Sequence, residues 1–93
     1  MLISFNFGEM RMNNLVNLTD TQDFGLAVAL VCKGYELVDL EKSFRGKRIT
    51  FRFNNKHGIN QASQDYWNGK LLVNAKTYWN ESKNLKTRLY SLG

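Results

Sequence analysis

One cysteine and one histidine are the side chains in this sequence best suited to covalent chemistry. A thiolate at Cys32 could act as a nucleophile if His57 served as its base. Cys32, however, ends an apolar run and His57 lies in a polar stretch, so we expect a cysteine that packs as a small hydrophobic side chain. We therefore predict no catalytic residue and no enzymatic activity.

Two carboxylates, Asp39 and Glu41, share one face of a predicted strand, because side chains alternate along a strand. Paired carboxylates can support acid–base chemistry or bind a metal ion. Without a third ligand beside them they are more typical of a solvated strand. The glycines Gly25 and Gly34 are too isolated to form a phosphate-binding loop. The sequence thus predicts no metal site and no cofactor.

The basic side chains are distributed unevenly and favour a binding function. Residues 1–41 carry six acidic and two basic side chains, a charge of −4, whereas residues 42–93 carry eleven basic and two acidic ones, a charge of +9. One acidic and one basic surface are expected from this division, and basic surfaces attract nucleic acid through phosphate neutralisation. The alternative is that a net charge of +5 only keeps a small basic protein in solution.

The candidate nucleic-acid-binding residues fall in two segments. One set belongs to a predicted hairpin and the other to the predicted last helix, which also offers an aromatic side chain for base stacking. The charged hairpin has a competing explanation, since charge at a sheet edge also prevents aggregation. The residues are Arg45, Lys47, Arg48 and Arg52 in the hairpin, and Lys83, Lys86, Arg88 and Trp79 in the helix.

The tripeptide Tyr-Trp-Asn occurs twice, at residues 66–68 and 78–80. Adjacent residues on a helix lie about 100° apart around its axis, so in each copy one aromatic ring packs inward while the other covers a groove or an interface. We expect the tyrosines to belong to the core and the tryptophans to be the more exposed pair.

These residues need elements to position them, and the sequence predicts one α+β domain at residues 15–93 with an optional N-terminal arm at residues 1–14. Residues 2–7 alternate like a strand, and Thr19 or Thr21 caps a buried helix that ends at Lys33 and Gly34. Strands follow at residues 35–41, with Leu37 on one face and Val38 and Leu40 on the other, and at residues 48–54.

Two further helices complete the predicted order of helix, hairpin, helix, helix. The first begins near Ile59 and stops at Gly69. The second is capped by Asn74 and carries an apolar stripe that extends to Leu92, with Lys76, Lys83, Thr87 and Tyr90 on another face. Two strands alone are marginal, so we expect a third strand from the N-terminal arm or from a second subunit paired through a sheet edge.

Several short motifs together resemble a family of small phage and bacterial domains of uncharacterised function. The resemblance extends from Thr21 to Tyr90 and implies a shared fold and a phage or prophage setting, but no catalytic residue. It rests on Thr21-x-Asp23-x-x-Leu26-Ala27-x-x-Leu30, Gly34 before a strand, Phe51-x-Phe53, Tyr66-Trp67-Asn68-Gly69 and Leu85-Lys86-x-Arg88-Leu89.

The function predicted from these features is a small nucleic-acid-binding or regulatory protein. The alternative is a protein-interaction module that inhibits or adapts a host or phage protein, for example through Glu36, Asp39 and Glu41. The single cysteine, the lack of a secretory signal and the shortness of every apolar run predict a protein of the cytoplasm that does not enter a membrane.

Overall fold

The computed structural model describes residues 18–43 and 48–92 of the chain. It contains a three-stranded antiparallel sheet and three helices in the order strand, helix, hairpin, helix, helix. The predicted α+β class and element order are confirmed. The predicted strand at residues 2–7 and the arm at residues 1–14 lie outside the described residues. The elements are β1 (Leu18–Thr21), α2 (Phe24–Cys32), β2 (Leu37–Lys42), β3 (Ile49–Asn54), α3 (Ile59–Trp67) and α4 (Ala75–Ser91).

The third strand of the sheet is β1, which lies directly before α2 and pairs with the central strand β3. The prediction that Thr19 or Thr21 caps the helix is therefore wrong. Both threonines belong to β1, where they pair with Phe53 and Phe51, and β-branched side chains suit such cross-strand positions. The helix is capped by Asp23, whose Oδ1 accepts a hydrogen bond from the Leu26 N–H at 2.7 Å.

Strand β2 contains a register shift between Leu37 and Asp39 that the sequence pattern did not predict. The irregularity lets both Leu37 and Leu40 pair with core residues of β3, namely Phe53 and Phe51. Leu37 and Leu40 both pack against the core, so the prediction that they lie on opposite faces is wrong, and Val38 is left 40% exposed. A strict alternation of faces cannot show where one residue is added to a strand.

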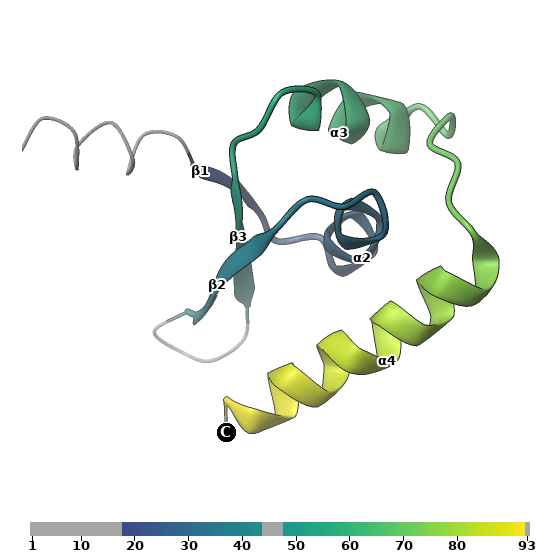
Figure 1. The fold of residues 1–93 in the computed structure, drawn as a ribbon. Helices are drawn as coiled ribbons and strands as arrows, with labels where there is room; N and C mark the ends of the chain where they lie inside the picture. The colour runs from purple at the N-terminus through teal and green to yellow at the C-terminus, as the bar shows by residue number, and fades with distance from the viewer. Residues whose placement is uncertain (1–17, 44–47, 93) are drawn as a thin grey trace, which may run out of the picture.

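Helix α2 forms the centre of the molecule, enclosed by the sheet, α3 and α4 (Figure 1). Five consecutive residues, Leu26–Leu30, are buried, as expected for a helix that is apolar on all sides. Phe51 and Phe53 pack against it from the sheet, Ile59 and Ala62 from α3, and Leu85 from α4. The helix ends at Cys32, with Lys33 as its C-cap and Gly34 following at a φ of 94°, which confirms the predicted end.

Two tyrosine hydroxyls hold α3 and α4 to the start of α2. The Tyr66 hydroxyl donates to Asp23 Oδ1 at 3.2 Å, and the Tyr78 hydroxyl lies 3.5 Å from the carbonyl oxygen of Gly25. A Cβ at residue 25 would meet both hydroxyls, so glycine is required for this close approach. Burial, followed by the nearby Asp23 carboxylate, raises the pKa of Tyr66, which keeps its hydroxyl protonated and able to donate.

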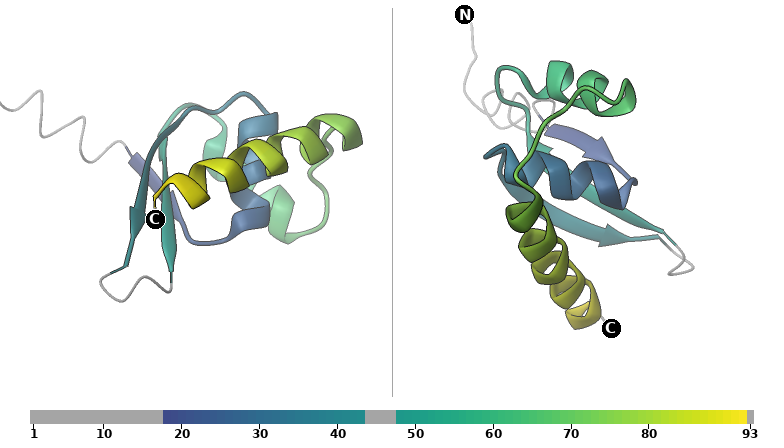
Figure 2. Two further views of the ribbon diagram at one scale, coloured as in Figure 1. Left: turned by 90° about the horizontal axis from the view of Figure 1, so that it is seen from below. Right: turned by 90° about the vertical axis from the view of Figure 1, so that its right-hand side faces the viewer.

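Helix α4 crosses beneath α2 and ends close to the sheet (Figure 2). Asn74 caps it, since its Oδ1 accepts a hydrogen bond from the Thr77 N–H at 3.0 Å. The predicted inward stripe is confirmed for Ser82 and Leu85, which are buried, and for Tyr78 and Leu89, which pack against the core. Leu92 is 40% exposed and lies beyond the helix.

Candidate nucleic-acid interface

Arg52, one of the predicted phosphate-binding residues, lies on the outer face of the sheet, which is the face turned away from α2. Its guanidinium is within 3.5 Å of Asp20 on β1, and within 3.2 Å of Asp39 and 2.5 Å of Glu41 on β2. These carboxylates, Glu41 foremost through its hydrogen bond, raise the pKa of Arg52. Three carboxylates surround a single positive charge, so Arg52 cannot attract a phosphate here.

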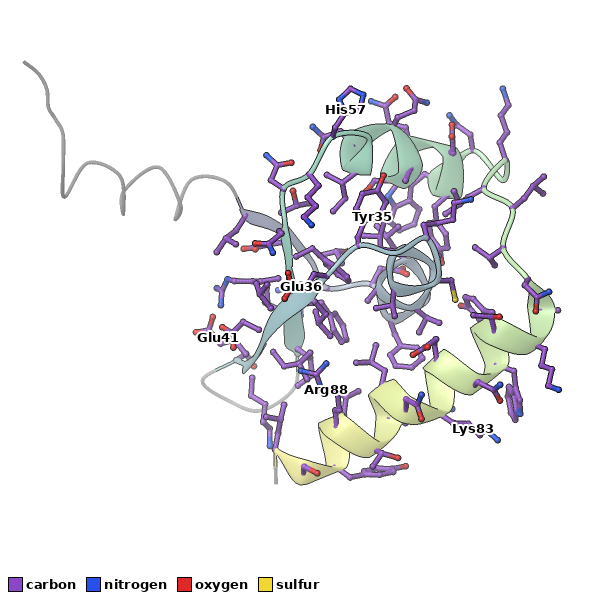
Figure 3. All side chains as sticks on the ribbon, viewed as in Figure 1. Tyr35, Glu36, Glu41, His57, Lys83 and Arg88 are labelled. Atoms are coloured by element: carbon purple, nitrogen blue, oxygen red, sulfur yellow. The ribbon has the colours of Figure 1, made fainter. Side chains whose placement is uncertain are left out.

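The outer face of the sheet is acidic as a whole. Glu36 adds a fourth carboxylate, which accepts a hydrogen bond from the Asn54 amide at 2.6 Å. Figure 3 shows Glu41 on the side of the sheet that faces away from α2. The four carboxylates come from residues 1–41, the acidic part of the sequence, and Arg52 lies among them. A polyanion would be repelled by this face.

The basic residues of α4 lie on a flank of that helix. The inward stripe consists of Tyr78, Ser82, Leu85 and Leu89, and the residue after each of these is turned by about 100° around the helix axis. This rotation places four exposed side chains in line along the helix. Lys76, one helical turn before Trp79, lies on the same line. The four are Trp79, Lys83, Lys86 and Tyr90.

Two lysines of this flank lie over aromatic rings. Lys83 Nζ is 5.7 Å from the centre of the Trp79 ring, and Lys86 Nζ is 6.0 Å from the centre of the Phe24 ring at the start of α2. Both distances are within the range of cation–π attraction, which is about 6 Å. Trp79 is 59% exposed, so one face of its ring is available to a ligand. The flank therefore offers both positive and aromatic groups.

Arg48, which directly precedes β3, extends this surface beyond the helix. It lines a hollow together with Phe24, and its guanidinium lies 3.4 Å from the side-chain oxygen of Gln22. Phe24 thus has Lys86 over its ring and shares the hollow with Arg48. We call Trp79, Lys83, Lys86, Phe24 and Arg48 the basic strip.

Arg88 is on α4 but not on the basic strip. It lines a separate hollow with Val38, Asp39 and Leu40 of β2. Figure 3 shows Arg88 on the side of α4 that faces the sheet and Lys83 on the side that faces away from α2. The structure thus brings Arg48, Lys83, Lys86 and Trp79 together and places Arg52 and Arg88 elsewhere.

Comparison with known proteins identifies the family. The model of the domain of unknown function DUF5659 matches residues 17–91. The chain belongs to the DUF5659 family. No curated protein and no solved structure matches it.

The resemblance to an uncharacterised family of small domains is confirmed by this match. Two of the eight predicted site residues of this DUF5659 domain, Arg45 and Lys47, lie outside the described residues. Phe24 is the site residue that sequence reasoning missed. It starts a helix that is apolar all round, and its partial exposure and its contact with Lys86 of α4 distinguish it from the buried residues that follow it.

Cys32, the nucleophile considered for covalent chemistry, is not activated in the DUF5659 fold. Burial, together with the charge of Glu81, raises the pKa of Cys32, which favours the thiol over the nucleophilic thiolate. His57 precedes α3, and its backbone carbonyl lies 3.4 Å from the Tyr35 hydroxyl. Among the described residues, no three side chains of the metal-binding types are grouped around a common point. In the same part of the chain, no helix combines the length and apolar character needed to span a bilayer.

Proposed function

We propose that this DUF5659 domain binds single-stranded nucleic acid along the basic strip. The observation that carries the proposal is the pairing of cations with aromatic rings: Lys83 lies over Trp79, and Lys86 lies over Phe24. Proteins that bind single strands combine such positive groups for the phosphates with aromatic side chains on which bases stack. No covalent chemistry is part of the proposed function.

The aromatic members of the basic strip favour a single strand over a duplex. Trp79 is more than half exposed and stands on a helix flank, where its ring can meet the face of a base. The faces of paired bases are covered by their neighbours in a duplex, whereas a single strand can turn its bases outward. DNA and RNA both meet these requirements.

Charge also favours one orientation of the protein on a polyanion. The basic strip runs along α4 to the start of α2 and to Arg48, which precedes β3, whereas the four carboxylates lie on the outer face of the sheet. Such a separation of charge steers a polyanion to the basic side during the encounter.

Binding should weaken steeply as salt is raised. Each phosphate neutralised on a single strand contributes about −0.7 to the slope of log affinity against log salt, so Arg48, Lys83 and Lys86 together give a slope of about −2. Fluorescence anisotropy with labelled DNA and RNA strands of about 12 nucleotides, a length in the range that small binding folds cover, measures this slope. No binding at about 50 mM salt and tens of micromolar protein would contradict the proposal.

A second candidate function is an interaction with a basic protein partner through the outer face of the sheet. The observation that favours it is the excess of carboxylates on that face, on which Asp20, Asp39 and Glu41 share one arginine. Both β1 and β2 are edge strands and could pair with a partner strand. A partner that remains bound after nuclease treatment, and is released by Asp39→Asn with Glu41→Gln, would support this function over the first.

We propose a phage or prophage setting and the cytoplasm as the place of action. The motifs that resemble small phage and bacterial domains support the setting. The single cysteine supports a reducing compartment.

A further inference from the structure

The basic strip borders a hollow of about 290 Å³ at the junction of α2, β3 and α4. Its floor is apolar, with Phe24 and Phe51 in an edge-to-face contact at 6.3 Å and with Ile49 and Leu89 beside them. Its remaining lining residues, Gln22 and Arg48, are polar. The hollow therefore combines an aromatic surface with hydrogen-bonding groups at its rim.

The polar groups of the rim are held only weakly by the protein itself. The Arg48 guanidinium lies 3.4 Å from the Gln22 oxygen, and the Gln22 amide nitrogen lies 3.5 Å from the Thr50 hydroxyl. Both distances are at the long end of the hydrogen-bond range, and both contacts are exposed to solvent. A ligand can therefore replace these partners at little cost.

We propose that this hollow binds one unstacked base of the single strand, an inference that rests on the proposed function. The base lies against the Phe24 ring, and the Gln22 amide, which offers both a donor and an acceptor, reaches the hydrogen-bonding edge of the base. The phosphate of the same nucleotide meets Arg48, which lines the hollow with Phe24, or Lys86, which lies over the Phe24 ring.

The composition of the hollow favours a nucleobase over an apolar peptide side chain. An apolar side chain would fill the floor but leave the amide and guanidinium at the rim without partners. The described residues that line the hollow include no carboxylate, so the nucleotide's negative charge meets no repulsion there. The volume is at the lower end of the range for small-molecule sites, about 300 Å³ and above, which suits one base and its sugar.

The test compares a strand that has bases with an abasic strand of the same length and charge. Phe24→Leu should lower the affinity for the base-containing strand about 5- to 150-fold, which corresponds to the loss of one stacked base. Its affinity for the abasic strand should stay at the wild-type value, because the phosphate contacts remain. Trp67→Leu, which removes an exposed ring from α3, is the matched control and should change neither affinity.

An unchanged affinity of Phe24→Leu for the base-containing strand, or an equal loss for both strands, would overturn the base-binding hollow while leaving the proposed function intact. If the variant does not fold, the side-chain NMR signals of Phe24, Ile49 and Leu89 in the wild-type protein decide the matter. They should shift with the base-containing strand and not with the abasic one, and the same small shifts with both would overturn the proposal. Failure of the wild-type protein to bind either strand would instead contradict the proposed function itself.

Discussion

Replacing Lys83 and Lys86 together by glutamine should weaken the binding of a single-stranded oligonucleotide about 25-fold at ~0.1 M salt. Each lysine that neutralises a phosphate contributes about 0.7 to the steepness of log affinity against log salt. Two lysines therefore make the affinity about 25-fold higher at ~0.1 M salt than at ~1 M salt, and this contribution is lost in the variant. The slope itself should change from about −2.1 to about −0.7, because Arg48 remains. Fluorescence anisotropy over a series of salt concentrations measures both quantities.

Two control variants separate the basic strip from the charge of the whole protein. Arg88→Gln removes a cation of the same helix that faces β2, and it should leave the slope unchanged. Lys56→Gln with Lys70→Gln removes two exposed lysines at the two ends of α3 and lowers the net charge as much as the test variant does. Equal losses of affinity in the test and control variants would mean that total charge, and not the basic strip, determines binding.

Phe53→Ala should lower the free energy of unfolding by about 3–5 kcal/mol, the usual cost of removing a buried aromatic ring. Phe53 is fully buried on the central strand, pairs with Thr19 on β1 and with Leu37 on β2, and packs against α2. A loss of this size is a large part of the stability of a small domain, which is typically about 5–15 kcal/mol. Urea unfolding followed by circular dichroism measures the change.

The matched control for the core variant is Trp67→Ala. Trp67 is a larger ring, but it is 62% exposed and has an edge contact with Tyr66. Its removal should change the free energy of unfolding by no more than about 0.5 kcal/mol. If Trp67→Ala proved as costly as Phe53→Ala, the core described for this domain would be incorrect.

Much of the fold could be predicted because local signals agreed with one another. Asn74, Gly34 and the stripe Tyr78–Ser82–Leu85–Leu89 are caps and periodic patterns, whose effects depend on neighbours in the sequence. The start of α2 was placed wrongly because Thr19 has the spacing of a cap and the β-propensity of a strand. Pairing with Phe53 on β3, which is far from Thr19 in the sequence, places Thr19 in a strand.

The candidate site could be predicted only in part because one of its predicted basic side chains forms ion pairs with strands that are far apart in the sequence. Arg52 alternates with the buried Phe51 and Phe53 in the sequence like any exposed strand residue, but the register places it opposite both Asp20 and Asp39. Arg88 is only two residues from Lys86, yet the helical turn moves it to the other flank. Helical spacing alone could have revealed that difference, whereas the ion pairs of Arg52 required the sheet register.

The two tryptophans provide the most direct measurement of the central claim. Trp67 and Trp79 are almost equally exposed, at 62% and 59%, but only Trp79 belongs to the basic strip. In a ¹⁵N correlation spectrum recorded during titration with a single-stranded oligonucleotide, the indole N–H signal of Trp79 should shift progressively and that of Trp67 should stay in place. A shift of Trp67 alone, or no shift of either signal, would contradict binding along this flank of α4.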